Sequence, residues 1–337
     1  IPAPRSSAAQ SSAIASTVAA RSLASLDSLK VSATGYNTKV VPLTSYEGTV
    51  DITLTSSAVA CNPADKLPDP VNVNITWRGA ALTGSHKVVV ETDPTLSGRT
   101  IYRPSDLGPG KKYPILVWGN GACSKNGTDH SDFWGEIASH GYIVINEGTP
   151  GGSGGYDMGT GMSALGSYLI KAFEWAIAQN DKPCSRFYQS LDTAKIGAFG
   201  YSCGGLMAYG ASLDAPRVKA SIIMNSGMLS RDVNAINKLH APIAYVCGGT
   251  GDMAYVNGER DFNDLGHLPT VFANVTNAGH GGTYGNDNGG EYGKFAVAWF
   301  NWWLKDDTGA TGRLKFVGDS KAFNSGAWSP MRAKKLP

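Results

Sequence analysis

The first third of the chain has the pattern of β-structure. Short runs rich in Val, Ile, Thr and aromatic residues alternate there with turn-rich segments, which is typical of antiparallel strands. The runs are TVDITLT, VNVNITW, HKVVVET and RTIYRPS, at residues 49–55, 71–77, 86–92 and 99–105. The chain begins with an Ala- and Ser-rich composition, and we expect a loose or helical N-terminal arm over residues 1–30.

From Tyr113 onward, short and continuously apolar runs alternate with stretches of helical periodicity. Such runs fit the strands of a parallel sheet that is buried on both faces and linked by helices. The runs are YPILVWG, YIVINEG, KIGAFGY, VKASIIMN, PIAYVCGG and TVFANVTN, and the helical stretches are residues 132–141, 163–180, 205–214 and 291–307. We therefore predict an α/β fold, a doubly wound and mostly parallel sheet with antiparallel N-terminal strands, in a single domain over residues 31–337.

Composition and charge narrow the class of protein. Of the 337 residues, 42% are apolar and 17% are charged, so the chain can bury a substantial core. The formal net charge is +2 and the basic residues are scattered, which argues against a nucleic-acid partner. No apolar run reaches the roughly 18 residues that a membrane span needs. We expect a globular protein without a membrane span, with a monomer favoured.

Several features favour secretion. Three Asn-x-Ser/Thr sequons begin at Asn74, Asn126 and Asn274. The N-terminal segment lacks the continuous apolar stretch of a signal peptide, so we expect a processed mature chain. An odd number of cysteines leaves at least one unpaired, and none has the spacing of a metal site: Cys61, Cys123, Cys184, Cys203 and Cys247. We expect a secreted glycoprotein with one or two disulfides, whose pairing the spacing leaves open.

One serine is flanked by glycines where a strand pattern gives way to a helix pattern. The segment FGYSCGG contains Gly200 and Gly204 around Ser202, which fits the motif G-x-S-x-G. In that context the motif makes a strained turn that lifts the serine hydroxyl above the edge of a sheet. Ser202 is therefore the candidate nucleophile.

A serine hydroxyl needs a general base, and in this architecture the chain order is serine, acid, histidine. His280 follows the last strand-like run and lies among small residues, whereas His240 and His267 precede strands and belong at the opposite edge of the sheet. The acid is expected after the preceding strand, where PIAYVCGGTGD places Asp252. Two later acids, at positions 261 and 264, lie in a polar helical stretch and are expected to be solvated or capping residues.

The chemistry also needs donors for an oxyanion. One is expected to be the backbone N–H of Cys203, directly after the candidate nucleophile. Another should come from the loop GNGAC, residues 119–123. There the backbone N–H of Asn120 or Gly121 can approach the oxyanion, because glycine has no side chain to block it. The sequence leaves open which of these two residues donates.

Six segments together resemble the α/β-hydrolase superfamily, most closely its chlorophyllase-like, dienelactone-hydrolase-like and polyester (PET) hydrolase-like esterases. They are PILVWGNGA, FWGEIASHGYIVI, KIGAFGYSCGG, VCGGTGD, NAGHGGTYG and AVAWFNWWLKDD, and they extend from about residue 112 to residue 307. The resemblance implies an α/β-hydrolase catalytic domain, a triad of Ser202, Asp252 and His280, and oxyanion donors near Asn120 and Cys203. Many lipases insert a lid domain at residues 228–241, but here the segment holds only one short helical stretch, so no large lid is expected.

Two cysteine positions depart from these relatives. In PET hydrolases a disulfide links the loop of the acid to a cysteine just past the histidine. Here Cys247 is present, but Gly281, Gly282 and Thr283 follow His280. In tannase and feruloyl esterase relatives a cysteine beside the serine pairs with one beside the histidine, and Cys203 lacks such a partner.

The glycine-rich segment at residues 148–161 lacks the Gly-Lys-Ser/Thr ending of a phosphate loop. We interpret it as a mobile loop that borders the cleft. The side chains considered for substrate contact are Trp134, Tyr156 and Met228.

We expect a serine hydrolase that cleaves carboxylic esters or lactones through an acyl-enzyme, with a small-molecule or polymeric ester as substrate and without a cofactor or metal. Three alternatives are weighed against it. A serine peptidase of the prolyl-oligopeptidase type would need a propeller, for which residues 1–110 are too few. An acyltransferase or cyclase would use the same triad in a water-poor pocket. A non-catalytic binding module on this fold usually lacks a triad member, and this chain has all three.

Overall fold

The computed structural model describes residues 28–31, 39–42, 61–79, 81–318 and 322–337. The chain forms two compact units, Ile1–Pro63 and Ala64–Pro337. In the first unit, β1 (Ser28–Val31) and β2 (Lys39–Pro42) pair in antiparallel fashion. The contacts divide the chain at residue 63, and the expected start of the catalytic domain at residue 31 stays a prediction. Most of the expected N-terminal arm, and the strand expected at 49–55, lie outside the described residues.

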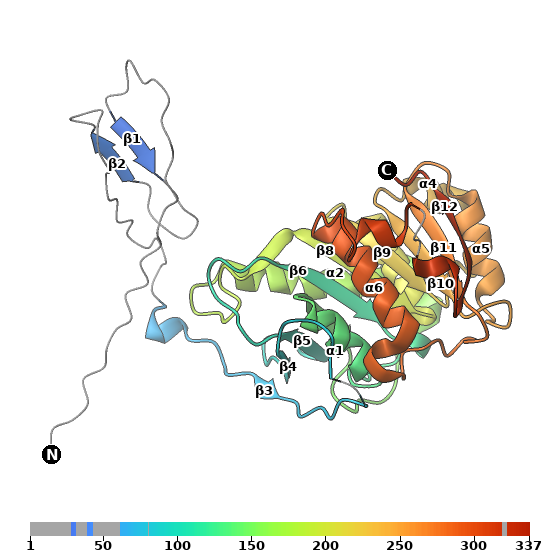
Figure 1. The fold of residues 1–337 in the computed structure, drawn as a ribbon. Coiled ribbons are helices and arrows are strands. Elements are labelled where there is room, and N and C mark those ends of the chain that lie inside the picture. The colour runs from blue at the N-terminus through green and yellow to red at the C-terminus, as the bar shows by residue number, and fades with distance from the viewer. Residues whose placement is uncertain (1–27, 32–38, 43–60, 80, 319–321) are drawn as a thin grey trace. The chain divides into compact units, whose positions relative to one another are not determined.

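The second unit is built on a ten-stranded sheet (Figure 1). Its strand order is β12-β11-β10-β9-β8-β6-β7-β5-β4-β3. The parallel strands are β6 (Tyr113–Gly119), β7 (Ile143–Glu147), β8 (Leu191–Tyr201), β9 (Val218–Met224), β10 (Ile243–Cys247) and β11 (Thr270–Val275). Antiparallel strands flank them: β3 (Val71–Asn72), β4 (Val88–Thr92), β5 (Arg99–Pro104) and β12 (Trp328–Lys334). This arrangement confirms the predicted doubly wound, mostly parallel sheet.

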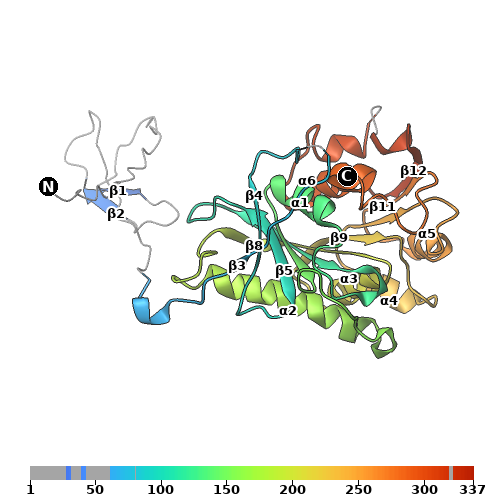
Figure 2. The ribbon, with the colours of Figure 1, turned by 90° about the horizontal axis from the view of Figure 1, so that it is seen from below.

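Helices cover both faces of the sheet (Figure 2). Side chains from four of them pack into one core cluster: α2 (Met162–Asn180), α3 (Cys203–Asp214), α4 (Val233–Lys238) and α5 (Tyr255–Asp264). The opposite face is covered by α1 (Ser131–Ser139) and α6 (Gly290–Leu304), whose aromatic side chains fill the second cluster. All seven residues of β6 are buried, as a strand covered on both faces requires.

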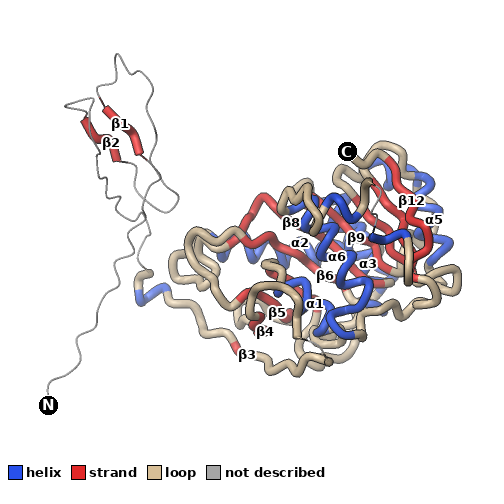
Figure 3. The backbone as a smooth tube through the Cα atoms, viewed as in Figure 1, coloured by secondary structure: helices blue, strands red, loops and turns tan. Residues whose placement is uncertain are grey.

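The parallel pairing of β6 to β11 brings the carboxyl ends of these strands to one edge of the sheet, whose strands are red in Figure 3. Loops that follow β6, β8, β9, β10 and β11 therefore meet there, which is where ligands bind in sheets of this type. Only the six-residue helix α4 lies between β9 and β10, so the expected absence of a large lid is confirmed for this connection. Within the described part of the chain, none of the helices is both long and apolar enough to cross a bilayer.

Candidate active site

Ser202 occupies a tight turn between β8 and α3. Its backbone has φ +53° and ψ −116°, in the left-handed half of the map that residues other than glycine seldom adopt. The turn is held because the Ser202 N–H donates to the carbonyl of Met224, at 3.0 Å. Close packing also fixes it: a Cβ on Gly204 would lie 1.8 Å from the carbonyl oxygen of Gly119. The glycines of the motif therefore allow α3 to begin directly against β6.

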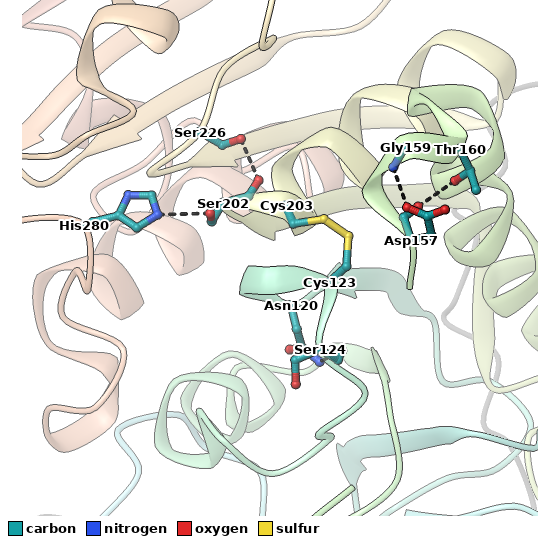
Figure 4. The surroundings of a disulfide bond; sticks show 10 residues. All are labelled: Asn120, Cys123, Ser124, Asp157, Gly159, Thr160, Ser202, Cys203, Ser226 and His280. Carbon is teal, nitrogen blue, oxygen red and sulfur yellow. Dashed lines mark hydrogen bonds between the residues drawn. A yellow bond between two sulfur atoms is a disulfide. The ribbon is translucent and has the colours of Figure 1, made fainter. Parts of the chain in front are cut away.

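His280 and Asp252 lie beside this serine. The Nε2 atom of His280 is 3.0 Å from Ser202 Oγ, and its Nδ1 atom is 2.7 Å from Asp252 Oδ1 (Figure 4 shows the first contact). An ionised carboxylate can only accept hydrogen bonds, so Nδ1 carries the proton and Nε2 is free to accept from the serine hydroxyl. The residues come from the ends of β8, β10 and β11, as the order of the motifs predicts.

Asp252 is buried and held by three donors besides the histidine. Its Oδ1 atom accepts from the N–H of Ala254 at 3.0 Å, and its Oδ2 atom accepts from the N–H of Gly248 at 3.2 Å and from Asn225 Nδ2 at 2.7 Å. Asn225 in turn accepts a hydrogen bond from the hydroxyl of Tyr284 at 2.7 Å. Sequence reasoning did not select Asn225, although it directly follows β9 at the same edge of the sheet.

The other histidines lie where the sequence predicts them. His240 and His267 contact the carbonyl oxygens of Val218 and Leu239, at 3.2 and 2.8 Å, toward the amino ends of the strands. One acid differs from expectation: Asp261 is not solvated but 1% exposed, and it accepts hydrogen bonds from Tyr209 and the backbone of Met228. Burial raises the pKa of Asp261, opposed by these hydrogen bonds and by Arg260.

The loop after β6 faces the serine turn. The buried side chain of Asn120 accepts from the indole of Trp118 at 2.7 Å, and its amide donates to three backbone carbonyls, those of residues 124, 126 and 147. The Asn120 side chain therefore shapes the loop from inside. Ala122 and Cys123, in the short turn Gly121–Cys123, both have left-handed φ values, +53° and +50°. Cys203 begins α3, so its N–H has no acceptor within the helix.

A disulfide joins the two segments. Cys123 and Cys203 are bonded, with a Cα–Cα separation of 5.1 Å, and both are buried (Figure 4). It is one of two disulfides in the protein, and Cys247 is a buried free thiol. The odd cysteine predicted from the count is thus Cys247, and Cys203 finds its partner in the loop after β6 rather than beside the histidine.

The glycine-rich segment 148–161 runs alongside this loop. The N–H of Tyr156 donates to the carbonyl of Cys123 at 2.9 Å, and the N–H of Lys125 donates to Gly154 at 3.0 Å. The hydroxyl of Tyr156 donates to the buried Glu147 at 2.7 Å. Burial raises the pKa of Glu147, and the neighbouring Arg99 opposes this effect. The segment is therefore fastened to the loop after β6 at several points.

Two side chains considered for substrate contact are buried. Trp134 is 0% exposed and packs against Trp118, and Met228 is 1% exposed in the core. This burial corrects both expectations, because neither side chain presents a surface to a ligand. Tyr201, which the sequence reasoning passed over inside the motif, is partly exposed instead, with its ring centroid 5.4 Å from that of His280. Tyr156 is also partly exposed.

The sequons differ in their exposure. Asn74 is exposed, Asn126 is partly exposed and donates to Asp129, and Asn274 is 7% exposed on β11. Within the described residues, no three His, Cys, Asp or Glu side chains gather as a possible metal site.

A family model described as PETase, PET hydrolase-like, matches residues 58–325. The chain belongs to the PET hydrolase-like family. This is a family of serine esterases in the α/β-hydrolase superfamily, in agreement with the sheet and helices described above. Membership supports hydrolysis of esters as the general activity. No curated protein matches the chain.

Proposed function

We propose that this member of the PET hydrolase-like family cleaves carboxylic esters or lactones with Ser202 as nucleophile, His280 as general base and acid, and Asp252 as the group that orients the histidine. The observation that carries the proposal is the unbroken hydrogen-bonded chain from Ser202 Oγ to His280 (3.0 Å) and from His280 to Asp252 (2.7 Å). Family membership independently supports the ester as the bond that is cleaved.

In the first half of the reaction, Ser202 Oγ bonds to the ester carbonyl carbon while its proton passes to His280 Nε2. The carbonyl π electrons move to the oxygen, which is then stabilised by the backbone N–H of Cys203 and a second N–H from Asn120 or Gly121. The tetrahedral intermediate collapses, the C–O bond to the alcohol breaks, and His280 returns the proton to the departing oxygen. Asp252 stabilises the imidazolium that exists between these two transfers.

In the second half, water replaces the alcohol. His280 removes a proton from the water as its oxygen attacks the acyl-enzyme, and the same N–H groups stabilise the new oxyanion. Collapse releases the carboxylic acid and returns the proton to Ser202. These steps use only groups of the chain and water, so the mechanism needs no cofactor.

The substrate is a small or polymeric ester, and the protein acts outside the cell. Disulfides persist in oxidising compartments, and this chain has two. Asn74 is the sequon most open to a glycosyltransferase, whereas Asn274 lies beneath the surface. A glycan is therefore expected at Asn74 in a secretory host.

The test is covalent labelling with a fluorophosphonate, followed by intact mass, together with hydrolysis of p-nitrophenyl esters from acetate to palmitate. We expect one adduct per chain, which is absent from Ser202→Ala, and a loss of turnover of at least about a thousandfold in that variant at nearly unchanged Tm. Labelling of Ser202→Ala, or turnover in it close to that of the native chain, would refute the assignment. Product analysis with added alcohol separates hydrolysis from acyl transfer, because transfer yields a new ester instead of the acid.

A further inference from the structure

The Cys123–Cys203 disulfide connects the two backbone segments that flank the candidate nucleophile. Cys203 directly follows Ser202 and begins α3, and Cys123 ends the turn that follows β6. The two cysteines are 80 residues apart in the sequence. In the proposed reaction one oxyanion donor comes from each segment, so this bond joins the two segments that supply the donors.

The conformation of both segments is unfavourable in isolation. Ala122, Cys123 and Ser202 all have φ between +50° and +53°, although none is glycine. Left-handed φ values cost free energy at residues with a Cβ and persist only where the surroundings over-determine them. On the loop side, Cys123 is part of the disulfide and Ala122 precedes it. On the helix side, Ser202 precedes Cys203.

Strands β6 and β8 pair as far as Gly119 and Gly200, directly before the loop and the serine turn, and other hydrogen bonds hold the loop beyond that point. The Asn120 amide bonds only to carbonyls of residues 124, 126 and 147, and the carbonyl of Cys123 accepts from Tyr156. The segments also pack on each other: Gly119 lies against Gly204, and Gly121 lies against the ring of Tyr201. Both contacts resist closer approach but not separation. Beyond the end of the β6–β8 pairing at Gly119 and Gly200, the disulfide is the covalent bond that opposes separation of the two donors.

Resting on the proposed function, we propose that the Cys123–Cys203 disulfide is a positioning element of the oxyanion hole, which holds the N–H of Cys203 at a fixed distance from the N–H of Asn120 or Gly121. Donors aimed at the oxyanion act on the transition state more than on the bound substrate. A displacement of about 1 Å in such a site can lower the rate about a hundredfold. The disulfide therefore contributes to kcat, with little effect on KM.

The experiment compares the native chain with the double variant Cys123→Ala/Cys203→Ala, which keeps both backbone N–H groups and leaves no unpaired thiol at the site. We expect kcat to fall by about tenfold to a hundredfold with KM within about twofold. A trifluoromethyl ketone that forms a tetrahedral adduct with Ser202 should lose affinity by the same factor as kcat/KM. Fluorophosphonate should still label the variant to one adduct per chain at completion, only more slowly.

Ile243→Ala is the matched control. Ile243 is buried at the start of β10, at the opposite edge of the sheet from the site, so the variant loses stability by creating a cavity. Its kcat and inhibitor affinity per folded molecule should equal those of the native chain. A role confined to stability would give the double variant the same behaviour as this control, and would overturn the proposal. An increase in KM at unchanged kcat would do so as well.

A second measurement decides the matter if the double variant does not fold. The native chain is reduced with a phosphine in increasing amounts, and each disulfide is followed by alkylation and peptide mapping. Activity should fall in proportion to the reduced Cys123–Cys203 peptide and return on reoxidation. Full activity with this bond reduced would refute the proposal. Failure of the proposed function is distinguishable, because the native chain would then take up no fluorophosphonate at Ser202.

Discussion

At the scale of single residues, Asn225 is the side chain that, besides His280, bonds to the candidate acid. It donates to Asp252 and accepts from Tyr284, and it does so from a left-handed backbone conformation, φ +43°. Its amide also donates to the Gly279 carbonyl and the Tyr292 hydroxyl. Asn225→Gly keeps this conformation accessible and removes all four hydrogen bonds. We expect kcat to fall by at least about tenfold and stability by about 1–3 kcal/mol, since each buried partner loses a hydrogen bond. Steady-state kinetics and thermal unfolding measure the two effects.

The control for this variant is Asn277→Gly, an exposed asparagine with φ +62°. It makes the same chemical change in the same region of the Ramachandran map, at a residue whose side chain is not one of the hydrogen-bond partners of Asp252. Equal kinetic losses in the two variants would mean that the Asn225 side chain does not orient Asp252.

His130, which contacts Tyr284, makes the stability of the folded protein depend on pH. Its ring stacks on Tyr284 at 4.8 Å, and burial lowers its pKa from 6.5 to about 4, with the charge of Arg78 acting in the same direction. Between these pKa values the unfolded chain binds a proton that the folded chain does not, so stability falls as the pH drops from about 6.5 to 4 and is full above that window. The loss amounts to at most about 3 kcal/mol.

The measurement is urea unfolding at a series of pH values for the native chain and for His130→Phe. The phenyl ring keeps the aromatic contact but does not titrate, so the variant should lose less stability than the native chain between pH 6.5 and 4. Parallel curves would show that His130 is not the group responsible, because acidic groups elsewhere contribute equally to both chains.

The sequence predicted which three side chains the structure brings together, but not the exposure of other side chains near them, for a physical reason. The positions of Ser202, Asp252 and His280 follow from strand polarity and glycine-rich turns, which are local signals. Whether an aromatic or methionine side chain points into a core or toward solvent depends on packing between distant segments. Substrate contact was therefore expected from Trp134 and Met228, which are buried. Tyr201, which is partly exposed, was not considered.

At the scale of elements, the contact of α3 with β6 decides where the serine turn sits. A Cβ at position 204 would lie 1.8 Å from the Gly119 carbonyl oxygen and 2.8 Å from the Asn120 nitrogen, so the helix would have to move. We expect Gly204→Ala to lower stability by about 3 kcal/mol or more and to abolish turnover. Calorimetry of the purified variant, or its absence from the soluble fraction, measures this.

Gly266→Ala serves as the comparison, because a Cβ at Gly266 meets no atom within 4 Å and the backbone there is not left-handed. Its stability should stay within about 0.5 kcal/mol of the native chain. If Gly204→Ala melted at the same temperature as this variant, the close contact would not be what fixes the turn.

The elements from β6 to α6 were predicted in order, since continuous apolar runs identify strands covered on both faces. Strand β12 was not predicted. Of its seven residues only Trp328 is buried, and Pro330 interrupts the strand pattern, as is tolerated at a sheet edge. An edge strand of this kind owes its existence to the hydrogen bonds offered by β11, which no local pattern reveals.

At the scale of the whole molecule, the order of strands in space differs from their order in the chain. The sheet runs outward from β8 and β6 in the middle to β3 at one edge and β12 at the other. The pattern of apolar runs and helical stretches in the sequence predicts the parallel centre of the sheet and its helices. The division of the chain at residue 63 depends instead on contacts between residues that are distant in the sequence.

Strand β12 is made after His280, yet it pairs with β11, the strand that leads into the histidine loop. During synthesis on a ribosome the serine turn and the acid can therefore form while the edge of β11 is still open. An open edge is a template for pairing with another chain. Nascent chains held before residue 328 should thus be the species that chaperones bind, and esterase activity should appear only once the final strand has left the exit tunnel.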